Sequence, residues 1–177
     1  MFKGLTKLLI CGGYNPDIDT CEVISLASSA STCKNPPNFS GRVRAAIGGL
    51  GFKGNPILCG GYQNGASSNK CYSLENNEWV SSASMNSVRA GAAAVQLQDG
   101  KHLVTGGRVP SNLNSAEMLT DKGWESNLPS LPVTINGHCM VTVNATTVMV
   151  IGGEENSQRS TATFYFTFVE KKLDRST

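Results

Sequence analysis

The chain has 177 residues, the length of one domain or of part of one. Charged residues make up 16 % and the formal net charge is +2, with the charges scattered along the chain. These values exclude a highly charged disordered chain and argue against nucleic-acid binding. Gly, Ser, Asn and Pro fill about a third of the sequence and punctuate short apolar runs, which predicts many short strands and few helices. No apolar run approaches the roughly 18–20 residues of a membrane-spanning helix.

The first apolar run begins after Lys7 and reaches only Ile10 before it meets Cys11-Gly12-Gly13. A secretory signal peptide needs an apolar region of roughly 7–15 residues. We therefore expect this segment to be a strand of the fold and not a leader.

Four apolar runs end in a pair of glycines. The pairs are Gly12-Gly13, Gly60-Gly61, Gly106-Gly107 and Gly152-Gly153. Their first glycines lie 48, 46 and 46 residues apart, a period that indicates a stack of similar units. Glycine is expected there because it removes Cβ where the chain bends or packs tightly.

The sequence around each glycine pair is that of a four-stranded unit. A run rich in small residues precedes the glycine-pair run, a polar loop of six to ten residues follows it, and a third and fourth run complete the unit. Tryptophan opens the fourth run at Trp79 and Trp124. Runs of four to eight residues between Gly, Asn, Ser and Pro clusters are typical of strands.

The pattern resembles the kelch repeat, which forms the blades of a β-propeller and has a period near 50 residues. The second unit is the most complete, with Gly60-Gly61, Tyr72, Trp79, Met85 and Arg89. The resemblance covers nearly the whole chain. It implies an all-β fold of about four kelch-type propeller blades, each with three to four antiparallel strands.

The other units depart from the pattern. The first has neither the tyrosine nor the tryptophan, the third has Glu117 or Met118 in place of the tyrosine, and the fourth has Phe164-Tyr165-Phe166 but no tryptophan. Only the second unit therefore has both the tyrosine and the tryptophan of the pattern, at Tyr72 and Trp79.

The units span about 5–36, 43–83, 89–128 and 137–170, within a propeller segment 1–170 that a tail, 171–177, follows. The first unit lacks its first strand and the fourth stops after its third, giving about fourteen strands. Propellers usually close a ring of roughly 4–8 blades. A partial propeller is therefore expected. The chain is then a fragment of a longer propeller, or it completes its ring with blades of another chain, or it closes as a small four-bladed ring.

Six cysteines lie at 11, 21, 33, 59, 71 and 139, with no CxxC pair that would indicate zinc. Cys11 with Cys21 and Cys59 with Cys71 recur in register, which is compatible with disulfides or with small buried strand residues. Disulfides would favour an extracellular over a cytoplasmic location, and the compartment stays open. The glycosylation sequons Asn38-Phe39-Ser40 and Asn144-Ala145-Thr146 are no more frequent than chance in a sequence this rich in asparagine.

By resemblance to the kelch family, the loops between second and third strands share a face with the blade-to-blade turns, and that face commonly binds proteins. Arginine and tyrosine are the side chains most suited to anchor a partner. The candidate binding residues are Tyr14, Asp17, Asp19, Arg44, Tyr62, Gln63, Asn64, Arg89, Arg108, Asn112, Asn114, Glu154, Glu155 and Arg159. Each is also explicable as a solvated loop residue, and Arg44 and Arg89 as residues that the repeat requires for blade structure.

Catalysis has little support in the sequence. His102 is expected at the surface, and His138 and Cys139 are neighbours in one strand whose side chains point to opposite faces. No metal site, cofactor site or catalytic residue is predicted. A non-enzymatic protein-binding module is therefore favoured. The alternatives are a fragment of a kelch-bladed enzyme such as a copper oxidase of the galactose oxidase kind, and the substrate-recognition part of a ubiquitin-ligase adaptor.

Overall fold

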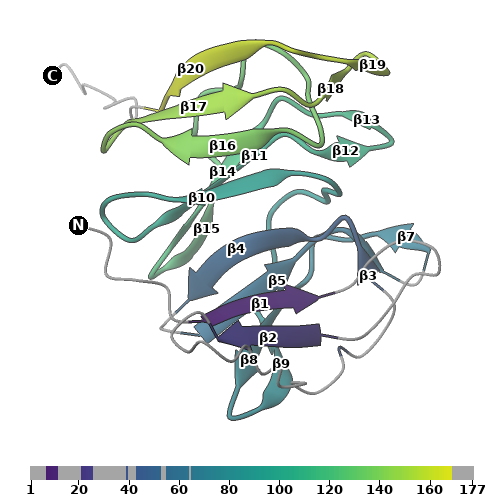
Figure 1. Ribbon diagram of the computed structural model, residues 1–177, viewed down its shortest axis with the longest axis vertical. Coiled ribbons are helices and arrows are strands. Elements are labelled where there is room, and N and C mark those ends of the chain that lie inside the picture. The colour runs from purple at the N-terminus through teal and green to yellow at the C-terminus, as the bar shows by residue number, and fades with distance from the viewer. Residues whose placement is uncertain are drawn as a thin grey trace, which may run out of the picture.

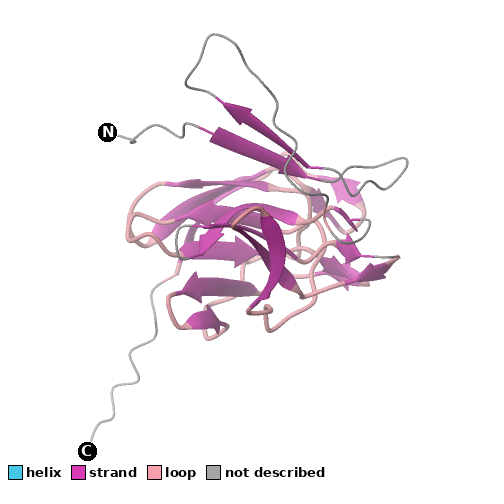
Figure 2. Cartoon of the chain, turned by 90° about the horizontal axis from the view of Figure 1, so that it is seen from below, coloured by secondary structure: helices cyan, strands magenta, loops and turns pink. Residues whose placement is uncertain are grey.

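The computed structural model describes residues 7–11, 21–25, 39, 43–52, 55–63 and 65–168 (Figure 1). Within these residues the secondary structure is strand, turn and loop, without a helix (Figure 2). No helix of this part of the chain is long and apolar enough to cross a membrane. The expected all-β fold class is confirmed.

Two four-stranded antiparallel sheets form the middle of the fold. In each, the strands lie side by side in chain order. The first contains β4 (Ile47–Phe52), β5 (Asn55–Cys59), β8 (Cys71–Glu75) and β9 (Glu78–Ser82). The second contains β10 (Ala93–Gln96), β11 (His102–Thr105), β14 (Ala116–Thr120) and β15 (Gly123–Glu125).

In the described residues, sheets with fewer strands come before and after these two four-stranded sheets in the chain. The last sheet has the three strands β16 (Cys139–Thr142), β17 (Thr147–Ile151) and β20 (Thr163–Thr167). Near the N-terminus, β1 (Lys7–Cys11) pairs with β2 (Cys21–Ser25). The last sheet and the β4–β5–β8–β9 sheet lie on opposite sides of the β10–β11–β14–β15 sheet, as in a β-propeller-like stack (Figure 1).

The first strands of successive sheets lie side by side, because β10 contacts both β4 and β16. Backbone hydrogen bonds join the units at equivalent positions. The amide of Gly91 donates to the carbonyl of Ala45 over 2.8 Å, and the amide of Gly137 donates to the carbonyl of Gly91 over 2.7 Å. Residues 45, 91 and 137 are 46 apart, so this contact repeats with the period of the sequence.

Short hairpins occupy the segments expected to be irregular polar loops. They are β6 (Tyr62–Gln63) with β7 (Ala66–Ser67), β12 (Arg108–Val109) with β13 (Ser111–Asn112), and β18 (Glu154–Glu155) with β19 (Gln158–Arg159). A further short strand, β3 (Val43–Arg44), pairs with β6. The count of about fourteen strands is therefore too low, because two-residue strands leave no apolar run in the sequence.

Strand register places the same positions of each unit opposite one another. The residue before each glycine pair faces the first residue of the next long strand. The pairs are Cys11 with Cys21, Cys59 with Cys71, Thr105 with Ala116 and Ile151 with Thr163. This equivalence lets the interior of one unit be compared with that of its neighbours.

The apolar cores lie between sheets. Ile47, Ile57 and Leu50 of one sheet pack with Val104 and Leu119 of the next. The following interface joins Leu103 and Met118 to Met140, Val148, Val150 and Phe166 of the last sheet. Burial of these side chains is the main force that holds the sheets together.

One large apolar side chain enters each interface from the segment between units. These residues are Phe39, Met85 and Leu131, 46 apart and each no more than 3 % exposed. Phe39 makes edge-to-face contacts with Tyr72 and Trp79, at 4.8 and 5.3 Å between ring centroids. The two aromatic positions of the repeat therefore form a socket for the preceding segment.

Two glycine pairs, Gly60-Gly61 and Gly106-Gly107, receive the backbone of the segment that leads into the next unit. Gly60 and Gly106 have φ of 62°, and a Cβ on either would collide with the carbonyl oxygen of Arg89 or Ile135 respectively. The next glycine donates its amide to that same carbonyl over 2.8 Å, as Gly61 to Arg89 and Gly107 to Ile135. Only glycine fits this close approach.

The far face of the last sheet is exposed. Val141, Val143 and Tyr165 are 49, 47 and 67 % exposed and are the large apolar side chains most open to solvent in the described part of the chain. The residues at the same positions of the preceding sheet include Leu97 and Met118, each 5 % exposed because the last sheet covers them. The last sheet thus has the apolar face of an inner unit without its cover.

Candidate functional site

The three short hairpins lie at one end of the sheets. In each unit the chain leaves the second long strand at the glycine pair, forms a hairpin and returns into the third long strand, so the hairpins project from equivalent strand ends (Figure 1). We call β6–β7 with its partner strand β3, β12–β13 and β18–β19 together the hairpin edge. Most candidate binding residues of the described segments lie on it.

Hydrogen bonds between units fix the backbone of this edge. Asn112 donates from Nδ2 to the carbonyl of Glu154 over 2.8 Å, and Asn136 donates from Nδ2 to Oδ1 of Asn112 over 2.8 Å. Asn136 and Glu154 also exchange two backbone hydrogen bonds of 3.1 and 2.8 Å. The β12–β13 and β18–β19 hairpins are therefore held in a set arrangement.

Asn136 was not among the predicted site residues. Its signal in the sequence is the 46-residue period, which places it at the same position as Arg44 and Ala90. Its identity differs between units, so it does not belong to the recognisable repeat pattern.

Arg44 and Tyr62 form the first part of the edge. They are opposite residues of β3 and β6, and the guanidinium carbon of Arg44 lies 4.7 Å from the ring centroid of Tyr62. Gln63 donates from Nε2 to the carbonyl of Gly60 over 3.0 Å. A cation stacked on a tyrosine ring gives this end a partly exposed contact surface.

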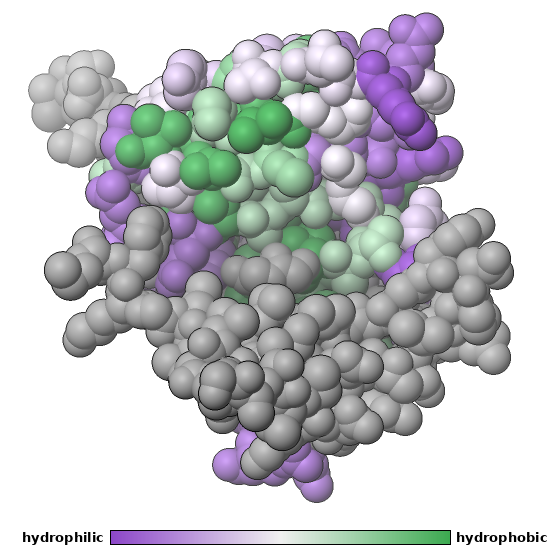
Figure 3. Space-filling view, in the orientation of Figure 1, coloured by the Kyte–Doolittle hydropathy of each residue, from purple (hydrophilic) through white to green (hydrophobic). Residues whose placement is uncertain are grey.

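Charged side chains of both signs dominate the other two hairpins. Arg108 and Arg159 are exposed, and Glu154 and Glu155 are partly exposed. The hydrophilic surface at the right of the space-filling view lies over these hairpins (Figure 3). Arg108 donates from Nε to the carbonyl of Pro110 over 3.1 Å, which limits the freedom of its exposed side chain. Asn114, at the end of the β12–β13 segment, is partly exposed.

The prediction that Arg89 belongs to the binding face is wrong. Its side chain is 0 % exposed and forms an ion pair of 2.9 Å with Glu117, which is also 0 % exposed. It donates further to the carbonyls of Gly106 and Ser115 over 2.7 and 3.0 Å. Arg89 therefore joins the segment between two units to the sheet of the following one and cannot contact a partner.

Of the predicted site residues and the two sequon asparagines, seven lie outside the described residues. Five of them, at the first glycine pair and its loop, are Gly12, Gly13, Tyr14, Asp17 and Asp19. The other two are Asn64 and the sequon residue Asn38. The contribution of Tyr14, Asp17, Asp19 and Asn64 to the binding face therefore stays a prediction.

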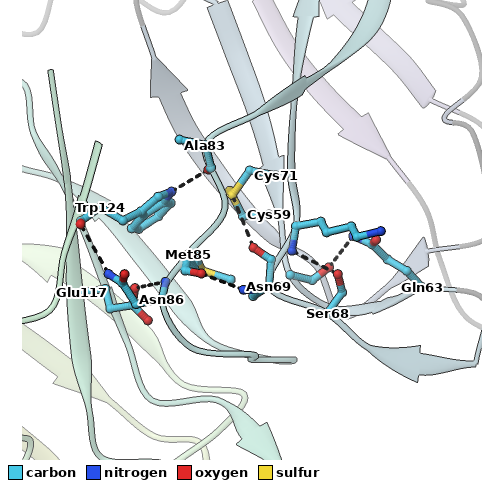
Figure 4. The surroundings of a disulfide bond; sticks show 12 residues. Cys59, Gln63, Ser68, Asn69, Cys71, Ala83, Met85, Asn86, Glu117 and Trp124 are labelled. Carbon is cyan, nitrogen blue, oxygen red and sulfur yellow. Dashed lines mark hydrogen bonds between the residues drawn. A yellow bond between two sulfur atoms is a disulfide. The ribbon is translucent and has the colours of Figure 1, made fainter. Parts of the chain in front are cut away.

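Cys59 and Cys71 form a disulfide with an S–S distance of 2.01 Å, and both residues are 0 % exposed (Figure 4). It lies beside the segment that enters the next unit, where Asn69 donates from Nδ2 to the carbonyl of Met85 over 2.8 Å. Of the two interpretations that the sequence left open for this cysteine pair, the disulfide is confirmed. For Cys11 and Cys21 the backbone register is the same, and their disulfide stays a prediction.

The two histidines are buried. His102 is 5 % exposed, so the expectation of a surface residue is wrong: the second strand of a covered unit is buried on both faces. His138 is 6 % exposed, and its Nε2 lies 2.8 Å from Oγ1 of Thr105. Cys139 is exposed, on the opposite side of the strand from His138. Among the described residues no group of three His, Cys, Asp or Glu side chains could hold a metal ion.

Burial lowers the pKa of His138 to about 4, because the charged ring would lose its hydration. The unfolded chain therefore binds a proton between about pH 6.5 and 4 that the folded state does not, and stability falls as pH falls through this window. We expect the free energy of unfolding to drop by about 2 kcal/mol between pH 7 and pH 5.

Urea unfolding at the two pH values measures this drop. His138→Ala is the control, because alanine occupies the equivalent positions 46 and 92 of the other units. In this variant the free energy of unfolding should depend less on pH. Burial also lowers the pKa of His102, so part of the slope should remain. An unchanged slope in the variant would contradict the assignment to His138.

Comparison with known proteins supports the fold. No family model matches the sequence, and no curated protein matches it. Among solved structures, the chain is similar to that titled "Structure of YjhT", with a TM-score of 0.77 and 15 % sequence identity. The match covers 95 % of this chain and 61 % of the YjhT chain, so this chain spans about three fifths of that structure's length.

Proposed function

We propose that this chain is part of a kelch-type β-propeller that binds a protein partner through the hairpin edge and carries out no catalysis. One observation supports the proposal above the others. A hydrogen bond from Asn112 to the carbonyl of Glu154 joins the equivalent β12–β13 and β18–β19 hairpins of two successive units, while the exposed side chains differ from unit to unit. A fixed backbone with varied polar side chains is typical of a binding surface.

The chemistry of the edge favours a protein ligand of mixed charge. Exposed Arg108 and Arg159 offer planar guanidinium groups for carboxylates, and Glu154 and Glu155 offer acceptors beside them. Tyr62 adds an aromatic surface at the other end. Charges of both signs suit a protein surface better than the uniformly negative backbone of a nucleic acid.

We further propose that additional blades, in the same protein or in another chain, cover the last sheet. Val141, Val143 and Tyr165 form an exposed apolar face whose counterpart in the preceding sheet is covered by the next unit. The structural similarity extends over only 61 % of the YjhT chain, which leaves room for such blades in a longer protein. A cover of this kind would be a sheet with an apolar face, like the one that Met140 and Val150 present.

Paired substitution of the two exposed arginines tests the binding proposal. Arg108→Ala with Arg159→Ala should weaken partner binding about tenfold or more, because arginine is enriched among the interface residues whose truncation costs about 2 kcal/mol or more. The measurement is quantitative affinity capture from the native source, followed by titration of each captured protein against the purified wild type and variant.

Lys122→Ala is the matched control, since Lys122 is exposed in the turn after β14, at the end of the sheet away from the hairpin edge. A genuine partner should bind this variant as it binds the wild type. Captured proteins that bind all three forms equally would contradict the proposal. Stoichiometric copper in the purified full-length protein would contradict its non-enzymatic part.

A further inference from the structure

The turn between β16 and β17 is exposed on every side. Val143, Asn144, Ala145 and Thr146 are all exposed, and the amides of Val143 and Asn144 donate to the carbonyl of Thr147 over 3.0 and 3.2 Å. This turn lies at the start of β17, whereas the hairpin edge follows the end of that strand. A group attached here would not block the hairpin edge.

Asn144 and Thr146 form a compact local structure. Oδ1 of Asn144 accepts hydrogen bonds from the backbone amide of Thr146 over 2.9 Å and from its hydroxyl over 3.3 Å. The side-chain nitrogen Nδ2 donates no hydrogen bond to any of the described residues. The fold therefore uses the oxygen of this amide and leaves the nitrogen open to solvent. Asn-X-Thr is the acceptor sequence for attachment of an N-linked glycan.

The disulfide points to a compartment in which this modification takes place. Cys59 and Cys71 are joined at a fully buried position between two sheets. Buried structural disulfides of this kind form in oxidising compartments such as the secretory pathway and not in the cytosol. The disulfide and the exposed acceptor turn are independent observations that agree.

A neighbouring unit on the far side of the last sheet would leave the turn accessible. In the preceding unit, which has a sheet on both sides, the equivalent turn keeps Gln98, Asp99 and Gly100 exposed. The other sequon differs, because its middle residue, Phe39, is 3 % exposed between Tyr72 and Trp79. The structure therefore favours the acceptor at Asn144.

We propose that Asn144 carries an N-linked oligosaccharide. In the transfer, Nδ2 of Asn144 forms a bond to the first carbon of a sugar held on a lipid pyrophosphate. The bond from that carbon to the phosphate oxygen breaks, the lipid pyrophosphate leaves, and the amide loses one proton to a base. The donor is a lipid-linked oligosaccharide and the catalyst a membrane-bound glycosyltransferase. This inference does not rest on the proposed protein-binding function.

Site-specific mass spectrometry tests the proposal. The 177-residue chain is expressed behind a cleavable secretory leader in eukaryotic cells, and the product is treated with an amidase that releases N-glycans and converts the carrier asparagine to aspartate. We expect the conversion at Asn144 in most molecules, and a single step in gel mobility that the treatment removes. Translation with microsomes gives the same readout if secretion is poor.

Variants of the turn provide the controls. Asn144→Gln and Thr146→Ala should both abolish the mobility step, and Thr146→Ser, which keeps a hydroxyl, should retain it. Asn38→Gln should leave the step unchanged. Wild-type protein that enters the secretory compartment with Asn144 unmodified would overturn the proposal, as would a glycan carried by Asn38 alone.

Discussion

Arg89→Ile and Glu117→Phe, made singly, are each expected to lower the free energy of unfolding by about 3–5 kcal/mol. Each substitution leaves a full charge in an interior where both partners are 0 % exposed. Removal of Arg89 strands the carboxylate of Glu117. Removal of Glu117 strands the guanidinium and takes the acceptor from the amides of Asn86 and Ser87, which lie 2.7 and 2.9 Å from the carboxylate oxygens.

The double substitution is expected to recover the part of that loss that comes from the uncompensated charge, while the amides of Asn86 and Ser87 stay without the carboxylate of Glu117. It reproduces the pair at the same positions of the next unit, where Ile135 and Phe164 pack without charge, and it resembles Val43 and Tyr72 in the preceding unit. Replacing a buried ion pair by apolar residues of suitable shape is often neutral or stabilising. Denaturant unfolding of the four proteins gives the coupling free energy directly.

Asp99→Asn is the control, because Asp99 and Lys101 form an ion pair of 3.1 Å whose side chains are 50 and 42 % exposed. Its effect should stay below about 1 kcal/mol. Additive losses in the Arg89 and Glu117 double variant would show that the two side chains do not act as a pair.

Loss of the Cys59–Cys71 disulfide is expected to lower the free energy of unfolding by about 3 kcal/mol, because an unfolded chain freed from a short closed loop gains conformational entropy. The double variant Cys59→Val with Cys71→Ala keeps apolar side chains at two buried positions. The valine and alanine side chains of this variant together are close in size to those of Thr105 and Ala116, the equivalent pair of the next unit. The measurement is thermal and denaturant unfolding of wild type and variant without reductant.

Cys139→Ala is the matched control, since Cys139 is an exposed free cysteine and should contribute little. Wild-type protein that has been unfolded and refolded in the presence of reductant should have a free energy of unfolding close to that of the double variant. Equal stability of the wild type and the double variant without reductant would contradict the expected contribution of the disulfide.

The spacing of the glycine pairs, together with the short apolar runs and the many turn-forming residues, was sufficient to predict the all-β fold and the positions of the long strands. The reason is physical: the approach of the next unit's backbone at Gly60 and Gly106 excludes every side chain, so the residue type is fixed by geometry. The Cys59–Cys71 disulfide was one of two alternatives for that recurrent cysteine pair, and the facing strand positions of the two residues bring their sulfur atoms within bonding range.

Other features depend on contacts that the sequence does not display. Arg89 looks like a surface arginine of a turn, and only the folded chain brings it to Glu117, 28 residues later. The short hairpins, such as β18–β19, are made by turn residues Asn156 and Ser157 at positive φ and have no apolar pattern. His102 follows a lysine but is only 5 % exposed, because its whole strand, β11, is buried.

The apolar clusters belong to pairs of neighbouring sheets, so a border between units in the sequence runs through a shared interior. Duplication of one 46-residue segment would then add a sheet and a complete interface together, because each unit brings both kinds of face. Deletion of an inner unit would likewise rejoin two complementary faces. The length of such a protein can therefore change by whole units without the invention of a new core, whereas a cut inside a unit leaves both products with an open face.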